Sequence, residues 1–170
     1  MTIRILGAIL ILLGCGGAGF LLAAACKQET TSLKNFIQSM NIMESELRYR
    51  KTPLPFLCHY IAATQSGVLR TYFFQLENEL QQQIQPDASA CAVLALNKTP
   101  HVPKTLKEII IQFARSLGEF DLEGQLLGIQ AVRNEAIMRF KLMSKDQEQR
   151  IKNYRTFGVC AGAAFIILFI

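Results

Sequence analysis

The stretch "LGEFDLEGQLLGIQ", residues 117–130, decides the fold, because it interrupts a long helical pattern with glycines and acids. Gly118 suits the left-handed backbone position that follows the end of a helix. Asp121 is placed to accept hydrogen bonds from the first free amides of a following helix, and Glu123 lies favourably in the dipole of that first turn. The stretch therefore predicts a corner between two helices, and not an acidic catalytic loop.

Apolar residues recur with a helical period on both sides of this corner. The stripe before it comprises Leu106, Ile109, Ile110, Phe113 and Leu117. The stripe after it comprises Leu122, Leu126, Ile129, Val132, Ala136, Phe140, Met143, Ile151 and Tyr154. Because no proline interrupts the second stripe, we predict one helix of about 30 or more residues that enters the C-terminal apolar segment.

The upstream part of the chain has the same period. One stripe comprises Leu33, Phe36, Ile37, Met40, Met43 and Leu47, and another comprises Leu69, Tyr72, Phe73, Leu76, Leu80 and Ile84. The first predicts a long helix that ends near Arg50. Thr52 and Pro53 then predict the N-cap and first residue of a short helix through Ala63. Pro86 and Asp87 predict the start of another short helix through Leu96. The fold class is all-α, a helical bundle.

Both ends of the chain are apolar. Residues 5–26 contain no charged side chain, and about 22 residues at roughly 1.5 Å each give about 33 Å, enough to cross a bilayer. The tail from residue 157 reaches only about 21 Å, so crossing would require Tyr154 and Arg155 to snorkel or the bilayer to thin. We predict an N-terminal transmembrane helix (1–26), a cytoplasmic helical bundle (27–155) and a C-terminal transmembrane helix (156–170). The long first and last helices of the bundle continue into these segments.

Small residues in the first apolar segment have two readings. The spacing of "GCGGAG", residues 14–19, matches a dinucleotide-binding loop, but the second strand and its acid are missing. In a membrane helix, Gly14, Cys15, Ala18 and Gly19 permit close packing and could support self-association into a homo-oligomer. We favour helix packing. Lipid attachment at Cys15 or Cys26, after removal of a signal segment, stays open as an alternative.

Basic residues crowd the inner flanks of both apolar segments, whereas Arg4 is alone on the outer side. They are Lys27, Lys34, Lys145, Arg150, Lys152 and Arg155. The positive-inside rule therefore predicts a cytoplasmic middle domain. The chain has a net charge of +5, concentrated between residues 133 and 155. Near a membrane entry, we interpret this charge as attraction to anionic lipid headgroups and predict no nucleic-acid partner.

The sequence contains no recognisable catalytic, cofactor or metal constellation. His59 follows Cys58 directly, so on a helix the two side chains diverge by about 100°. The acid pairs Glu44 with Glu46 and Glu77 with Glu79 are two residues apart and face different ways. We interpret these acids as parts of solvated helix faces and predict a non-enzymatic protein with no cofactor.

Four segments together resemble the stage III sporulation protein AB family across essentially the whole chain. They are "LGAILI" (6–11), "ESELRYRKTPLP" (44–55), "SLGEFDLEGQ" (116–125) and "YRTFGVCAGAAFIILFI" (154–170). The chain departs from the family pattern in "FLC" after Pro55, where an acid and an alanine are expected. This departure affects the surface chemistry of the short helix that follows more than the fold.

The resemblance implies an integral membrane component, in the mother-cell membrane of a spore-forming bacterium, of the channel complex that links mother cell and forespore. It also implies a helical domain similar to the cytoplasmic domain of type II secretion system protein F. The implied partners are a secretion-type ATPase and ring-forming membrane subunits. We expect the partner surface near the most specific motifs, at Arg48, Tyr49, Arg50, Pro53, Gly118, Asp121 and Gln125. The alternative is a lipid-facing structural or sensing protein without a dedicated protein partner.

Overall fold

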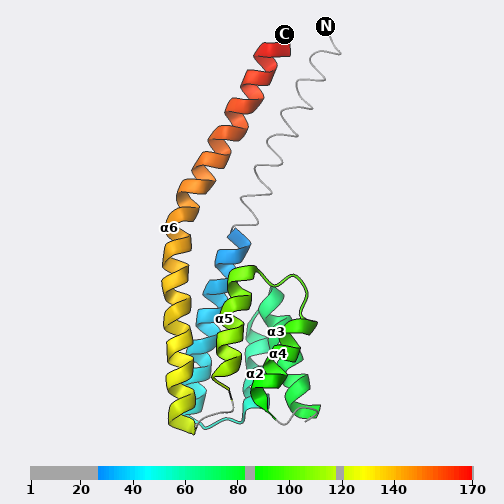
Figure 1. The fold of residues 1–170 in the computed structure, drawn as a ribbon, viewed down its shortest axis with the longest axis vertical. Coiled ribbons are helices and arrows are strands. Elements are labelled where there is room, and N and C mark those ends of the chain that lie inside the picture. Colours follow the sequence, from blue (N-terminus) through cyan, green and yellow to red (C-terminus); the bar gives the residue numbers. More distant parts are fainter. Residues whose placement is uncertain (1–26, 83–86, 118–120, 170) are drawn as a thin grey trace. The chain divides into compact units, whose positions relative to one another are not determined.

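The structure, a computed structural model, describes residues 27–82, 87–117 and 121–169, without the side chains of 146–155 and 157–169. Every regular element in these ranges is a helix, so the predicted all-α class is confirmed (Figure 1). The chain divides into two units. One is Thr31–Phe140, and the other combines the chain ends, Met1–Thr30 and Lys141–Ile170. The first unit contains the helical body and the site discussed below.

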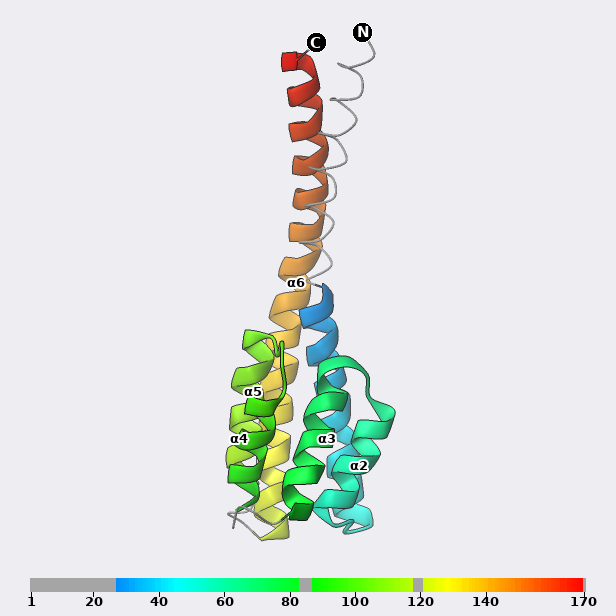
Figure 2. The ribbon, with the colours of Figure 1, turned by 90° about the vertical axis from the view of Figure 1, so that its right-hand side faces the viewer.

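A helix at residues 27–49, called helix 27–49 here, opens the described part of the chain. It is followed by α2 (Leu54–Thr64), α3 (Gly67–Gln82), α4 (Ala88–Lys98), α5 (Lys104–Arg115) and α6 (Leu122–Phe169). Consecutive helices pack as neighbours, α2 against α3, α3 against α4, and α4 against α5 (Figure 2). The sequence order of these helices is therefore also their order in space.

Three phenylalanine rings join helices that are distant in the sequence. The ring centroids of Phe36 and Phe113 lie 6.2 Å apart, and those of Phe73 and Phe113 lie 6.4 Å apart, both edge to face. All three side chains are fully buried. Such pairs each contribute about 0.5–1.5 kcal/mol beyond the burial of their area. The centre of the body is thus the meeting point of helix 27–49, α3 and α5.

The predicted apolar stripes supply this core. The buried positions among them are Leu33, Phe36, Met40, Met43, Leu47, Leu69, Tyr72, Phe73, Leu76, Leu106, Ile109, Ile110, Phe113, Leu117, Ile129, Val132 and Ala136. Ile37 and Leu80 are half-buried, Leu122 is exposed, and Ile84 lies outside the described residues. The helical period therefore identified the core-facing side of each of these helices.

Two of the predicted helix caps are confirmed. The Asp87 carboxylate accepts a hydrogen bond from Ser89 N at 3.2 Å and begins α4. The Asp121 carboxylate accepts one from Gly124 N at 3.0 Å and begins α6. Each cap satisfies an amide that has no partner within its own helix. The predicted corner at Asp121 is therefore present, whereas Pro86 and Gly118 lie outside the described residues.

The predicted cap at Thr52 is wrong. Pro53 and not Thr52 occupies the N-cap position of α2, no side chain caps this helix end, and the Thr52 hydroxyl donates to the Glu46 carboxylate at 3.0 Å. Lys51, just before, adopts a left-handed backbone with φ of 52°. This conformation ends helix 27–49 and turns the chain into α2. The chain is thus directed into α2 by the turn at Lys51, and no side-chain cap is present at the start of α2.

α6 confirms the prediction of one long uninterrupted helix, with 48 residues. Its first turns pass very close to the end of α5. A Cβ atom added to Gly128 would lie 2.7 Å from Ser116 Cβ, closer than such atoms approach. Glycine at position 128 thus permits the close contact between α5 and α6.

None of the helices in the described ranges is both long enough and apolar enough to cross a membrane. The predicted N-terminal span, with its packing residues Gly14, Cys15, Ala18 and Gly19, lies outside the described residues. The predicted C-terminal segment forms the last part of α6 as far as Phe169.

Candidate partner interface

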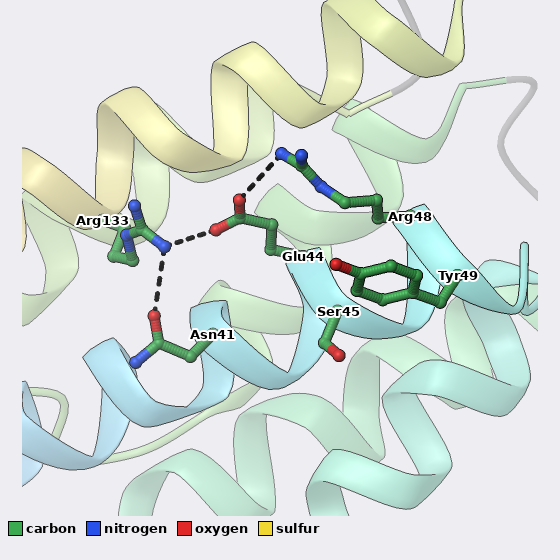
Figure 3. Close-up of a pocket in the computed structure, with 6 residues that line it drawn as sticks. All are labelled: Asn41, Glu44, Ser45, Arg48, Tyr49 and Arg133. Atoms are coloured by element: carbon green, nitrogen blue, oxygen red, sulfur yellow. Dashed lines mark hydrogen bonds and ion pairs between the residues drawn. The ribbon is translucent and has the colours of Figure 1, made fainter.

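A solvent-open cavity of about 290 Å³ lies between helix 27–49 and α6 (Figure 3). Five of its residues come from helix 27–49, where spacings of three and four place them on one side. The sixth comes from α6. The lining residues are Asn41, Glu44, Ser45, Arg48, Tyr49 and Arg133. We call this cavity the Arg48 pocket.

Glu44 is the centre of the hydrogen bonding in the Arg48 pocket. Its Oε1 accepts from Arg48 Nη2 at 3.1 Å and from Gln130 Nε2 at 2.6 Å. Its Oε2 accepts from Arg133 Nη1, which also donates to Asn41 Oδ1 at 3.2 Å (Figure 3). The Glu44 side chain is only 15% exposed, so this carboxylate depends on its protein donors for compensation.

The Arg48 pocket keeps a surplus of positive charge and of donors. Two guanidinium groups face one carboxylate, and each arginine bonds through a single nitrogen. Arg133 Nε is buried and has no hydrogen-bond partner among the described residues. An unmade bond of a buried donor costs about 1–3 kcal/mol. The surplus positive charge, with Arg48 47% exposed, suits the pocket to an incoming acceptor with negative charge.

An exposed aromatic ring forms part of the lining. The Tyr49 side chain is 80% exposed although it is large and mostly apolar. Tyrosine and arginine are enriched where proteins meet, because each combines apolar area with a directed polar group. Tyr49 and Arg48 thus give the pocket the residue types of a protein-binding surface.

The structure brings together only part of the predicted partner surface. Arg48 and Tyr49 line the pocket, but Arg50 instead pairs with Glu46 at 3.2 Å. Pro53 is exposed at the start of α2. Asp121 is exposed and its carboxylate caps α6, and Gln125 is half-buried, while Gly118 lies outside the described residues. None of the described residues of this corner, 121–125, is a lining residue of the pocket.

Sequence reasoning missed four of the lining residues, Asn41, Glu44, Ser45 and Arg133. Glu44 had been assigned to a solvated helix face, and Arg133 to a basic region that attracts lipid headgroups. In the structure they pair with each other across two helices. Their spacing in the chain carries no signal, because helical periodicity relates only residues three or four apart.

Arg139 is likewise paired, with Glu135 and with Glu108, each at 2.7 Å, and these two hydrogen bonds raise the pKa of its guanidinium.

The interpretation of Glu77 and Glu79 as solvated acids is also wrong. Their side chains are 11% and 4% exposed. Glu77 contacts His59 Nδ1 of α2 at 3.1 Å and accepts from Gln81, and Glu79 accepts from Lys98 Nζ of α4 at 2.5 Å. A carboxylate this deeply buried needs such partners. The prediction that the two acids face different ways is confirmed, because each meets a different helix.

Cys58 and His59, neighbours in the sequence, do not form a reactive pair. Cys58 is fully buried whereas the His59 side chain is 68% exposed, so the predicted divergence of these neighbours is confirmed. Burial, and secondarily the charge of Glu77, raises the pKa of the Cys58 thiol far above its usual range. A raised pKa keeps the thiol protonated and unreactive. Over the described ranges, no group of three histidine, cysteine or acidic residues could hold a metal ion.

Comparison with known proteins gives two matches. The family profile described as stage III sporulation protein AB (spore_III_AB) matches residues 4–170. A solved structure described as "Stage III sporulation protein AB (SpoIIIAB)" is similar, with a TM-score of 0.63 and 21% sequence identity, covering 69% of this chain and 94% of that chain. At this identity the structural likeness shows the fold. No match is found among curated proteins.

Proposed function

Because this chain belongs to the stage III sporulation protein AB family, we propose that it is a non-enzymatic platform in the channel complex between mother cell and forespore. Family membership itself indicates a role in sporulation. The role as a docking platform for other channel components is the proposal. It rests above all on the Arg48 pocket, which presents an exposed tyrosine and two arginines on a well-packed helical body.

Its partners in this proposal are the secretion-type ATPase and the ring-forming membrane subunits of the same complex. The protein is an integral protein of the mother-cell membrane, anchored through its apolar ends, with its middle domain in the cytoplasm. The apolar composition of residues 5–26 and the basic residues beside both ends support this arrangement. The likeness to type II secretion system protein F stays a prediction from the sequence.

The pairing of the basic residues favours a protein partner over a lipid partner. Lipid recognition uses clusters of lysine and arginine whose charge is available to headgroups. Arg133 and Arg139, in the basic part of the chain, each pair with carboxylates of the helical body. This leaves less of the charge between residues 133 and 155 for a membrane surface than the sequence had indicated.

The test is charge reversal in the sporulating host. We expect Arg48→Glu to reduce the number of heat-resistant spores at least tenfold while the level of the protein in the membrane stays normal. Arg70→Glu is the matched control, because Arg70 is exposed on α3 and does not line the pocket. Normal sporulation with Arg48→Glu would exclude the pocket as a docking site.

Crosslinking in the same cells separates the two classes of function. A photoreactive phenylalanine replaces Tyr49, whose side chain is exposed, and the adducts are identified by mass spectrometry. We expect adducts with one or a few channel proteins, absent when Arg48→Glu is combined with the probe. Adducts with lipids alone would instead establish the lipid-facing alternative.

A further inference from the structure

We infer that the Arg48 pocket receives the carboxylate of an acidic side chain of a partner protein, and that an apolar neighbour of that side chain packs on Tyr49. The inference deepens the proposed platform function and rests on it, since it states what the docked partner presents. Four properties of the pocket lead to this inference. They are its hydrogen bonding, its charge, its size and its aromatic lining.

The one carboxylate of the pocket already accepts three hydrogen bonds. Both carboxylate oxygens of Glu44 accept from arginine, and Oε1 also accepts from Gln130. Among the described residues, Arg48 donates through Nη2 alone, and its side chain is 47% exposed, so its other nitrogens remain available as donors. These donors favour an acceptor as the group that enters the pocket, and guanidinium binds carboxylates through short, charge-assisted hydrogen bonds.

The charge of the pocket matches one negative charge. Two arginines and one glutamate leave a net charge of +1 among its lining residues. A single carboxylate would bring the lining to neutrality. A phosphate dianion would overshoot it, and a membrane surface is recognised by clusters of several basic residues rather than by one unbalanced charge. A lipid phosphodiester also carries a single charge, so it is the isolation of this one unbalanced charge that favours an aspartate or glutamate over a membrane surface.

The size of the cavity favours a side chain over a free metabolite. Pockets for drug-sized ligands enclose about 300–1,000 Å³ and bury most of the ligand. The Arg48 pocket, at about 290 Å³ and open to solvent, lies at the lower limit. Because the pocket is open, it would leave much of a free ligand in solvent, whereas the rest of a docked partner would cover a bound side chain.

Tyr49 adds the apolar part of the recognition. Its side chain is 80% exposed, and it lines the same cavity as Arg48. An acidic side chain that enters the pocket brings its neighbours onto this ring. A leucine or similar residue beside the acid would cover the ring and remove its apolar area from water. The expected partner segment is thus acidic and apolar together.

The chain offers an internal reporter for this binding because it contains no tryptophan. Tyr49→Trp keeps an aromatic side chain and introduces a single indole beside the pocket. The full chain carrying this change is placed in nanodiscs of zwitterionic phosphatidylcholine. It is titrated with the peptide N-acetyl-Leu-Glu-Leu-amide and, separately, with N-acetyl-Leu-Gln-Leu-amide. The two peptides differ only in the charge that the pocket is inferred to bind.

We expect the glutamate peptide to change the indole fluorescence saturably, with a Kd of about 1 mM, as suits one recessed contact. The glutamine peptide should bind at least tenfold more weakly. Adding Arg48→Gln should weaken the glutamate peptide about tenfold, while Arg70→Gln, the exposed control on α3, leaves it unchanged. Circular dichroism checks that each variant keeps its helix content.

Three results would overturn the inference. One is equal binding of the two peptides, and another is no response to the glutamate peptide up to about 20 mM, well above the expected Kd. The third is a fluorescence change that depends on Arg48 when phosphatidylglycerol replaces part of the phosphatidylcholine, with none for the peptide, because the occupant would then be a lipid. If either of the first two results accompanies loss of spores in Arg48→Glu, the platform stands and only the carboxylate is excluded, whereas the third result would favour the lipid-facing alternative.

Discussion

The carboxylate of Glu44 and the guanidinium of Arg133 form an ion pair although the two residues are 89 positions apart in the chain. The pair joins the two helices that border the Arg48 pocket. Gln130, one turn before Arg133 on α6, donates to the same carboxylate at 2.6 Å. Glu44 therefore both shapes the pocket and holds helix 27–49 against the start of α6.

Glu44→Gln should lower the free energy of unfolding by about 1–3 kcal/mol, because it leaves Arg133, only 25% exposed, without its counter-charge. Glu46→Gln is the control, since Glu46 pairs with the exposed Arg50 and such pairs contribute about 0.2–1 kcal/mol. Urea unfolding followed by circular dichroism measures both. Equal losses in the two variants would show that the Glu44 pair has no special weight.

Gly128→Ala should destabilise the body by about 1–3 kcal/mol, because the new Cβ would lie 2.7 Å from Ser116 Cβ and force α5 and α6 apart. In a helix without this contact, the same change stabilises by about 1 kcal/mol. Ser116→Gly removes the opposing atom. Gly128→Ala should therefore lower the free energy of unfolding much less in a Ser116→Gly background than in the parent. A double-mutant cycle of thermal unfolding measures this difference. Additive effects would contradict the close approach.

Asp121→Ala should lower the free energy of unfolding by about 1 kcal/mol through loss of the cap on α6. Asp121→Asn keeps an acceptor oxygen for Gly124 N and should stay close to the parent. The same pair of variants separates capping from partner binding in the sporulation assay. A spore defect in Asp121→Asn, with stability retained, would assign the charge of Asp121 to a partner contact.

Tyr72→Phe should make the protein less sensitive to alkali. Burial, and secondarily Cys58, raises the pKa of the Tyr72 phenol well above its ordinary value, so the folded state keeps the proton. The unfolded chain releases it above about pH 10. The unfolded state then binds fewer protons, and the free energy of unfolding falls as pH rises from there, by up to about 1.4 kcal/mol per pH unit. Below pH 10 this contribution is fully present.

Urea unfolding between pH 8 and 11 (a range set by the phenol pKa of about 10) measures this effect. The stability of Tyr72→Phe should fall less steeply above pH 10 than that of the parent. Near neutral pH the variant should be at least as stable, because the buried Tyr72 hydroxyl has no hydrogen-bond partner among the described residues. Tyr60→Phe, at an exposed position, controls for the loss of one phenol and should not change the slope.

The elements that the sequence predicts well are those whose cause is local. Asp87 and Asp121 cap helices because each offers an acceptor to amides within three residues. The apolar period placed Phe36, Phe73 and Phe113 inward on three helices before any contact was known. It did not show that the three rings meet. The distance between rings on different helices depends on how the helices pack against one another.

The site was predicted only in part, for the same physical reason. Arg48 and Tyr49 belong to a recognisable motif and do line the pocket. Arg133 completes the pocket from another helix, and nothing near it in the sequence indicates Glu44. At Thr52 the local pattern predicted a helix cap that the structure does not contain. Its hydroxyl instead donates to the carboxylate of Glu46, six residues earlier. The hydrogen-bond partners of these side chains depend on the tertiary structure, and local patterns in a single sequence do not identify them.

Glu77 and Glu79 give α3 a fixed register against both neighbouring helices. A slide of α3 by one turn, about 5.4 Å, would pull Glu77 from His59 and Glu79 from Lys98 together. Two buried carboxylates would then lose their partners at once, so the layer of α2, α3 and α4 locks into a single alignment during folding.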